Sequence, residues 1–400
     1  MSELDQAAIV YGKPAGEGGL GHFAATAISG LATGGRDLLI LGPGASPIWP
    51  LPGERPGGSW ILSPPGIQPW MVGYTWLRWR PGQVTLRCDR RQGIWAAREL
   101  ERSRPQACYL FTQIALETLQ WCRREGIPTV LDNPNGHIRN FREVCEKESQ
   151  RWFGKRFFGH PTAQMVERVE EEYRLADRIR VHSQWAKDSM LRRGVPENKI
   201  HLLRQTLNLE RFHPPSRRAP TDGPLRVCYV GGLDVRKGFA YLLQAIRAVG
   251  ASRVQLRIVG NTGDRNCAQL FRRERLGLQV ESAPGDPLPI YQRSEVFVFP
   301  TLEDGLGLVA LEAQACGLPV ILTEEAGAKE CVRPGRTGWV VPAANAEALA
   351  AALEDALGKR AELSEMGRQA RADVERYAGP EQLSQLSDWF YCPARAELHS

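Results

Sequence analysis

The segment EVFVFPTLEDGLGLVALEAQACGLPVILT, residues Glu295–Thr323, decides the fold. It opens with an apolar run that ends at Pro300, and it closes with a second apolar run, Val320–Thr323. Between these runs, Leu308–Cys316 has the apolar spacing of a helix. Short buried strands joined by a helix are typical of a parallel sheet. The segment therefore predicts an α/β fold.

The same alternation extends outward through most of the chain. Further helical patterns lie at Gly21–Ala32, Gln113–Arg124, Pro161–Ala176 and Phe239–Val249. The other predicted strands are Ala7–Gly12, Leu38–Gly42, Cys108–Thr112, Thr129–Leu131, Ile179–His182, His201–Arg204, Leu225–Val230, Val254–Val259, Val296–Phe299 and Trp339–Val341. Strands and helices that alternate in this way predict doubly wound parallel sheets with helices on both faces.

A proline-rich stretch divides the chain. Residues 207–224 contain four prolines and interrupt the patterns on either side, so they are the predicted linker. It separates a Rossmann-like domain, residues 1–206, from a second one, residues 225–378. Residues 379–400 are predicted to form a C-terminal helix and tail that pack on one domain, with the N-terminal domain as the candidate. Ligands of such folds bind at the carboxyl ends of the strands, so two facing domains are expected to form a cleft.

Composition and charge narrow the class of protein. Of 400 residues, 42% are hydrophobic and 24% charged, which is typical of a globular protein and not of a disordered one. The net charge of +6 comes wholly from residues 1–200, with 27 basic and 21 acidic side chains. This excess is too small to indicate a nucleic-acid partner.

Cysteine usage and hydropathy indicate a cytoplasmic protein. The nine cysteines include no C-x-x-C pair, so neither a disulfide framework nor a structural zinc site is expected. The N-terminus lacks the pattern of a signal peptide, and no apolar run is long enough to span a bilayer. The protein is expected to be soluble, or at most peripheral at a membrane.

The first glycine cluster is GEGGLG, which matches G-x-G-x-x-G through Gly16, Gly18 and Gly21. It follows a predicted strand and opens a helix, as a phosphate-binding turn does. A dinucleotide site would also need a carboxylate at the end of the next strand, and that strand ends in Gly42 without one. A nicotinamide cofactor is therefore disfavoured. Close approach of a ligand to Gly18 and Gly19, or a turn needed only for packing, remain as interpretations.

A second segment places two cations at the start of a helix. In RVCYVGGLDVRKGF, a strand ends at Gly231, and Arg236 and Lys237 precede a helix. Cations at a helix N-terminus oppose the helix dipole unless an anion neutralises them. The pattern is that of a diphosphate held by both cations and the helix amides, or of a solvated turn.

The third candidate set lies in the opening segment. Glu303 and Asp304 precede Gly307, and the helix that follows carries Glu312 two turns in. The glycines leave backbone amides exposed for phosphate oxygens. The acids could bind ligand hydroxyls, or serve as a helix cap and a surface charge.

Together these segments resemble the family 4 retaining glycosyltransferases of GT-B fold. DGLGLVALE (Asp304–Glu312) is similar to the family's E-G-F-G-L-x-x-x-E segment, and GGLDVRKG (Gly231–Gly238) to its G-R-L-x-x-x-K-G segment. The approach to the linker, Ala176–Leu203, and the stretch Leu131–Glu148 are also similar. The resemblance covers roughly residues 7–42 and 105–375.

Two positions depart from the family pattern. Asp304 stands where the family usually has Glu, with Glu303 beside it, and Gly232 replaces the usual Arg. Arg236 is the candidate to supply the missing guanidinium. If Arg236 does not supply it, the diphosphate is expected to bind more weakly, or the domain to be inactive.

The resemblance implies a role for each candidate residue. A nucleotide-diphosphate sugar would lie in the second domain, with Asp304 on the sugar hydroxyls and Glu312 on the ribose. Lys237 and Arg236 would hold the diphosphate, assisted by the amides of Leu308 and Val309. The remaining donor-binding candidates are Gly18, Gly19, Gly231, Glu303 and Gly307.

The implied reaction needs no metal and no cofactor. The family transfers the sugar by same-face attack, and the departing phosphate takes the acceptor's proton. Preorganised cations are worth most where negative charge grows on that leaving group. His137 matches in outline the family histidine near the donor sugar, with a solvated helix-capping histidine as the alternative interpretation.

The acceptor is less defined by the sequence. Residues 43–91 are predicted to be strands and loops rich in Trp, and Tyr74–Gln92 carries the arginines 78, 80, 87, 90 and 91. Trp and Arg together could contact an anionic membrane or a lipid-linked saccharide, or could form a core with a solvated arginine face. A saccharide or lipid-linked acceptor is expected. The alternatives are another GT-B enzyme, a non-catalytic nucleotide-sugar-binding subunit and a scaffold.

Overall fold

The computed structural model describes residues 6–15, 18–33, 36–46, 51, 56–63, 81–157, 159–216, 222–261, 265–283 and 285–391. The chain divides into two compact units. Unit 1 comprises residues 1–142, 158–206 and 379–400, and unit 2 comprises residues 143–157 and 207–378.

Unit 1 is built on a seven-stranded parallel sheet in the order β3-β2-β1-β4-β5-β6-β7. The strands are β1 (Gln6–Val10), β2 (Asp37–Gly42), β3 (Ser59–Leu62), β4 (Ala107–Phe111), β5 (Thr129–Asp132), β6 (Arg178–Val181) and β7 (Ile200–Leu202). The central strands are apolar and buried because helices cover both faces of the sheet.

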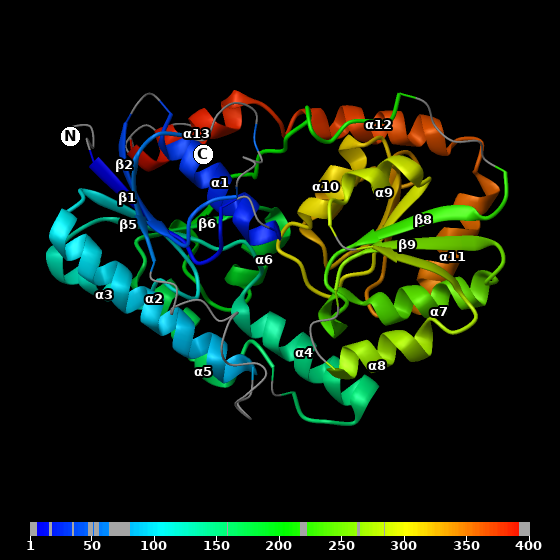
Figure 1. Ribbon diagram of the computed structural model, residues 1–400, viewed down its shortest axis with the longest axis horizontal. Helices are drawn as coiled ribbons and strands as arrows, with labels where there is room; N and C mark the ends of the chain where they lie inside the picture. The colour runs from blue at the N-terminus through cyan, green and yellow to red at the C-terminus, as the bar shows by residue number, and fades with distance from the viewer. Residues whose placement is uncertain are drawn as a thin grey trace. The chain divides into compact units, whose positions relative to one another are not determined.

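The helices of unit 1 form two layers (Figure 1). Helices α1 (Gly18–Leu31) and α13 (Pro380–Tyr391) pack together on one face, where the Tyr391 hydroxyl donates to the Leu31 carbonyl at 3.0 Å. The other face carries α2 (Pro81–Ser103), α3 (Leu116–Glu125) and α5 (Ala163–Leu175). Helix α6 (Gln184–Leu191) connects β6 to β7. The C-terminal helix is thus part of unit 1.

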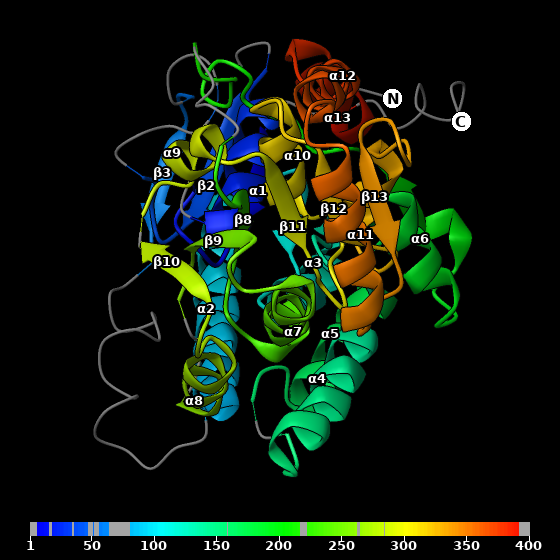
Figure 2. The ribbon, with the colours of Figure 1, turned by 90° about the vertical axis from the view of Figure 1, so that its right-hand side faces the viewer.

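Unit 2 contains a six-stranded parallel sheet in the order β10-β9-β8-β11-β12-β13. Helices α7 and α11 lie side by side on one face of this sheet, and α10 lies on the other (Figures 1 and 2). The strands are β8 (Leu225–Val230), β9 (Val254–Val259), β10 (Gln279–Ala283), β11 (Val296–Phe299), β12 (Val320–Thr323) and β13 (Gly338–Val341). The helices are α7 (Phe239–Val249), α8 (Arg265–Glu274), α9 (Leu288–Arg293), α10 (Leu308–Ala315), α11 (Ala346–Gly358) and α12 (Leu363–Glu375). The α/β class expected from the sequence is confirmed by both sheets.

Helix α4 (Ile138–Phe153) contributes to both units. Its residues from Glu143 onward cluster with unit 2, although the sequence places them in the first domain. There the Tyr241 hydroxyl of α7 donates to Glu148 Oε2 at 2.7 Å, and Trp152 Nε1 donates to the same oxygen at 2.9 Å. These contacts to Glu148 explain why the second half of α4 clusters with unit 2 and not with the first domain.

The interpretation of residues 43–91 as strands and loops is wrong from Pro81 onward. Helix α2 begins at Pro81, a residue whose fixed φ suits the first turn of a helix. Gln92, Ala96 and Leu100 form its buried side. These residues recur every four positions, which is the spacing of one face of a helix. Residues 47–50, 52–55 and 64–80, with Trp49, Trp70, Trp76, Trp79, Arg78 and Arg80, lie outside the described residues.

Candidate functional site

The candidate residues of unit 2 lie on two segments at the carboxyl ends of β8 and β11. After β8, Gly231 leads into a 3₁₀ turn, Val235–Lys237, which Asp234 caps by accepting a hydrogen bond from the Lys237 amide at 3.1 Å. Gly238 then adopts a φ of +66° and opens α7. A Cβ at Gly238 would lie 2.0 Å from the Pro300 carbonyl oxygen, so only glycine allows this turn to approach the end of β11.

The segment after β11 supplies the carboxylates. Asp304 Oδ1 accepts hydrogen bonds from the amides of Leu306 (3.2 Å) and Gly307 (2.7 Å). Gly307 has a φ of +80° and precedes α10, whose first amides belong to Leu308 and Val309. Asp304 therefore fixes the loop that leads into α10. It is not the cap of that helix, because Gly307 holds the N-cap position and no side chain caps it.

Lys237 and Asp304 form an ion pair through Nζ and Oδ2. Their side chains are 13% and 15% exposed, and the ammonium also lies 5.3 Å from the centre of the Phe299 ring. Burial alone would raise the pKa of Asp304, but the nearby Lys237 and Arg236 hold it below its usual range. The carboxylate is thus charged and paired at the start of a helix.

Arg236 is held by Glu303. Its Nη1 lies 2.8 Å from Glu303 Oε2 and 2.9 Å from the Glu303 carbonyl oxygen. Burial alone would lower the pKa of Arg236, but Glu303 and the neighbouring carboxylates raise it. The sequence predicts that Arg236 binds the diphosphate. In the structure, its guanidinium instead pairs with the Glu303 carboxylate.

Glu312 lies in α10 and is 5% exposed. The Tyr291 hydroxyl of α9 lies 3.0 Å from its Oε2. Burial raises the pKa of Glu312 to about 7, although Tyr291 and the nearby Arg211 act to lower it. Sequence reasoning did not single out Tyr291, because a lone tyrosine in a short helix carries no motif.

The remaining candidates belong to unit 1. Gly18 and Gly19 form the first turn of α1, and Gly16 lies outside the described residues. His137 is buried directly before α4, where its Nδ1 accepts a hydrogen bond from the Arg139 amide at 3.2 Å. Its Nε2 lies 4.0 Å from Glu170 Oε1. The hydrogen bond from Arg139 supports the capping interpretation of His137, but the side chain is buried and not solvated as that interpretation assumed.

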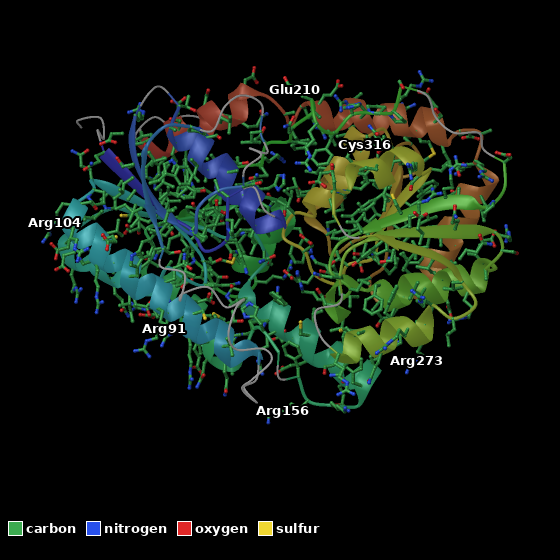
Figure 3. All side chains as sticks on the ribbon, viewed as in Figure 1. Arg91, Arg104, Arg156, Glu210, Arg273 and Cys316 are labelled. Atoms are coloured by element: carbon green, nitrogen blue, oxygen red, sulfur yellow. The ribbon has the colours of Figure 1, made fainter. Side chains whose placement is uncertain are left out.

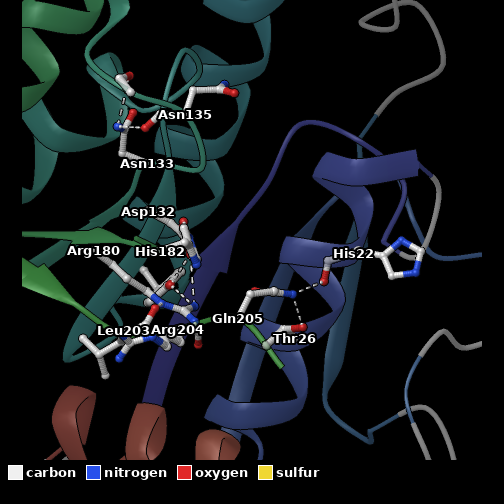
Figure 4. A network of polar contacts seen from close by, with 12 residues as sticks. His22, Thr26, Asp132, Asn133, Asn135, Arg180, His182, Leu203, Arg204 and Gln205 are labelled. Atoms are coloured by element: carbon white, nitrogen blue, oxygen red, sulfur yellow. Dashed lines mark hydrogen bonds and ion pairs between the residues drawn. The ribbon is translucent and has the colours of Figure 1, made fainter. Parts of the chain in front are cut away.

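Unit 1 also holds a buried polar network that the sequence did not predict (Figure 4). Asp132, at the end of β5, contacts the Tyr109 hydroxyl, His182 Nε2 at 2.7 Å and Arg180 Nη1 at 3.3 Å. Arg180 also donates to the carbonyls of residues 203 and 204. Nothing in the local pattern of these strands signals that the four side chains meet.

Within the described residues, the chain lacks three features. No helix among them has the length and apolar character needed to cross a membrane. No cluster of three or more His, Cys, Asp or Glu side chains in those ranges is arranged to hold a metal ion. Their eight cysteines form no disulfide, and Cys316, for example, lies buried at the C-terminal end of α10 (Figure 3).

Comparisons with known proteins agree with the motifs. Residues 224–359 match the family described as glycosyl transferases group 1. The capsular polysaccharide biosynthesis glycosyltransferase CapM of Staphylococcus aureus is 31% identical over 153 residues, which are 37% of this chain and 40% of that protein. The alignments with the curated relatives span about two fifths of those proteins' length.

Solved structures match over almost the whole chain. Sucrose-phosphate synthase from Thermosynechococcus elongatus has a TM-score of 0.76 at 20% identity, covering 98% of this chain and 100% of that one. Anabaena HepE, solved in complex with UDP and glucose, has a TM-score of 0.67 at 14% identity, covering 99% and 100%. The resemblance drawn from the motifs is confirmed to this extent: residues 224–359 match the group 1 glycosyltransferases, and almost the whole chain has the GT-B fold.

Proposed function

We propose that this chain is a retaining glycosyltransferase that moves a sugar from a nucleoside-diphosphate sugar to a hydroxyl of an acceptor. The observation that carries the proposal is the pairing of Lys237 with Asp304 at the start of α10, inside the segment that matches the family. A cation and a carboxylate held side by side suit a ligand with a phosphate next to a polyol.

The roles follow from the chemistry of each group. Lys237 would turn from Asp304 to the diphosphate, and the amides of Leu308 and Val309 at the helix start would add hydrogen bonds. Asp304 would then accept hydrogen bonds from sugar hydroxyls, and Glu312 from the ribose. Gly231 and Gly307 would let the backbone approach the ligand.

The proposed reaction needs neither a metal nor a cofactor. The bond from the anomeric carbon to the diphosphate breaks, and a bond to the acceptor oxygen forms on the same face. The departing phosphate oxygen takes the proton of the acceptor hydroxyl. Lys237 and the helix amides would stabilise the negative charge that grows on the leaving group, where each such donor is worth about 10² to 10³ in rate.

Arg236 and Glu303 have a different proposed part. The Arg236 guanidinium already pairs with Glu303. Arg236 would therefore support diphosphate binding indirectly, by holding Lys237 in position. Arg236 and Glu303 are adjacent in sequence to Lys237 and Asp304, so the first pair fixes the backbone that carries the second.

Incubation with UDP-glucose, GDP-mannose and ADP-glucose tests the function, with free nucleotide release and transfer to added saccharides as readouts. Lys237→Ala is expected to lose about 10² to 10³ of the turnover while keeping the far-UV spectrum of the wild type. The matched control is Lys359→Ala, which removes an exposed lysine paired with Asp355. Equal turnover in wild type and Lys237→Ala would refute the diphosphate assignment.

A non-catalytic nucleotide-sugar-binding subunit is the second candidate function. It is favoured by Gly232 in place of the family arginine and by the engagement of Arg236 with Glu303, which together reduce the positive charge facing a diphosphate. Binding of a sugar nucleotide without hydrolysis or transfer to any acceptor would select this function.

The acceptor is proposed to be a saccharide, free or lipid-linked, as the name of the relative CapM supports. Contact with an anionic membrane is part of this proposal, and so is a cytoplasmic site of action. Arg87, Arg90 and Arg91 are exposed on α2, and Figure 3 shows Arg91 on the outer side of that helix. Flotation with anionic liposomes at low salt tests the contact. A protein that stays at the bottom of the gradient would contradict membrane binding.

A further inference from the structure

The hydroxyl of Tyr291 lies between two hydrogen-bond acceptors. Its oxygen is 3.1 Å from the Val309 carbonyl oxygen and 3.0 Å from Glu312 Oε2, both on α10. A hydroxyl has a single hydrogen, so it donates to one of these oxygens only. A backbone carbonyl brings no hydrogen of its own, whereas a carboxyl group does when it is protonated. Both contacts are hydrogen bonds at once when Glu312 donates to Tyr291 and Tyr291 donates to Val309.

The surroundings of Glu312 favour that neutral form. Glu312 is 5% exposed and the Tyr291 side chain is fully buried. Two charged groups lie nearby, Arg211 from the segment before β8 and Asp286 from the loop before α9. They pair with one another at 3.1 Å; Arg211 lowers the pKa of Glu312 and Asp286 raises it, and burial outweighs both.

Tyr291 itself and one neighbour of its hydroxyl are also uncharged. Besides Glu312, the titratable side chains around its hydroxyl are Cys228 of β8 and Cys316 at the end of α10. Burial raises the pKa of Cys228 to about 12, and burial raises the pKa of Tyr291 well above its ordinary value. Both groups therefore stay protonated at neutral pH.

We infer that Glu312 is protonated in the ligand-free protein and that binding of a sugar nucleotide discharges its proton, while the Tyr291 hydroxyl reverses from acceptor to donor toward it. This inference rests on the proposed function and deepens it. The ribose diol brings two hydroxyl hydrogens to the carboxyl group. The O–H bond of Glu312 breaks, its proton passes to solvent, and the carboxylate accepts charge-assisted hydrogen bonds from the ribose.

Tyr291 is thus a positioning residue for either form of Glu312. It accepts from the acid and donates to the carboxylate, and the second bond is the stronger one because it is charge-assisted. A prediction follows that does not depend on the nucleobase, because UDP-, GDP- and ADP-sugars share the ribose. The affinity for the sugar nucleotide falls as pH decreases below about 7, approaching tenfold per pH unit for one proton released.

Calorimetry measures this linkage directly. UDP-glucose, GDP-mannose and ADP-glucose are screened against the wild type at pH 8.5, and the one that binds is used. Their diphosphate is a diester with no group that titrates near neutrality, so a released proton comes from the protein. Titrations at pH 7 in two buffers of different ionisation enthalpy are expected to show about half a proton released per ligand bound.

Two variants separate proton linkage from a structural role. Glu312→Gln has no proton to lose, so it is expected to release none from this site and to bind with an affinity that is flat from pH 6 to 8.5. Tyr291→Phe removes a bond that favours the carboxylate, so the midpoint of its affinity profile is expected to move to higher pH. A purely structural effect of Tyr291→Phe would lower the affinity by the same factor at every pH.

The outcomes discriminate between this inference and the proposed function. Binding without proton release in the wild type overturns the inference and leaves the function standing, as does equal release in Glu312→Gln. If none of the three sugar nucleotides binds the wild type between pH 6 and 8.5, the proposed function fails and the inference fails with it.

Discussion

Arg236 and Glu303 form a buried ion pair one position away from the pair of Lys237 and Asp304. Arg236 Nη1 lies 2.8 Å from Glu303 Oε2, and the two side chains are 13% and 1% exposed. Because both pairs join consecutive residues of the same two segments, they form a ladder between the turn after β8 and the loop after β11. Both pairs therefore tie the same two segments together.

Removal of one member of the buried pair is expected to be costly. Glu303→Ala leaves the Arg236 guanidinium in a buried position without that carboxylate, so the free energy of unfolding should fall by about 3–5 kcal/mol. Urea denaturation followed by circular dichroism measures the loss.

An exposed pair provides the matched control for Glu303. Arg253 and Glu354 are also joined by two hydrogen bonds, at 2.6 and 2.8 Å, but their side chains are 48% and 46% exposed. Glu354→Ala should cost less than about 1 kcal/mol. Similar losses in the two variants would show that burial of the Arg236 pair is not what makes it stabilising.

The strands of unit 2 were predictable from the sequence for a physical reason. Strands covered on both faces are rich in apolar residues, as β11 (VFVF) and β12 (VILT) are, and β8 and β9 keep several buried apolar residues among their polar ones. Strand β10, QVESA, did not stand out because Val280 is its one large apolar residue. Helix α2 was missed altogether, and its start gives no clear signal because Pro81 and Gly82 indicate a loop as readily as a helix N-terminus.

The candidate residues could be named from the sequence, but their contacts could not. Lys237, Asp304 and Glu312 stand in motifs, whereas the ion pair between Lys237 and Asp304 depends on how the turn after β8 and the loop after β11 come together. The partner of Arg236 depends on which carboxylate two distant segments bring to it. Tyr291 and the network around Asp132 carry no local signal, since a single polar residue in an apolar run becomes informative only when its neighbours in space are known.

The Asp132 network should be decisive for the stability of unit 1. Asp132→Asn removes the charge that faces Arg180, which is 1% exposed, so the free energy of unfolding is expected to fall by about 3–5 kcal/mol. The control is Asp177→Asn, at an exposed carboxylate that accepts hydrogen bonds from the Thr129 amide and hydroxyl, where about 1 kcal/mol is expected. Chemical denaturation of both variants provides the comparison; a loss at Asp132 no larger than at Asp177 would contradict a structural role for the network.

His137 can be tested by separating its cap from its imidazole. His137→Ala removes both, whereas His137→Asn keeps a side-chain acceptor suited to the start of α4. If the imidazole acts on the sugar, both variants should depress transfer more than sugar-nucleotide binding. If the cap is its whole role, His137→Asn should retain wild-type transfer and only His137→Ala should lose stability, by about 0.5–2 kcal/mol.

Glu312 should also make the stability of the protein depend on pH. Its pKa is raised from about 4.5 in the unfolded chain to about 7 by burial, so the unfolded state ionises first as the pH increases. The neutral acid contributes its full stability below pH 4.5, and that contribution is lost as the pH rises through about 7. One pKa unit corresponds to about 1.4 kcal/mol, so the total loss is on the order of 3 kcal/mol.

Glu312→Gln isolates this effect because the amide does not titrate and still donates to Tyr291. The free energy of unfolding of the variant, minus that of the wild type, should increase by up to about 3 kcal/mol between pH 5 and pH 8.5. Urea denaturation of both proteins at the two pH values measures the difference. The other buried acids titrate in both proteins and cancel in the subtraction, so a difference that stays constant with pH would mean that Glu312 is already ionised at pH 5.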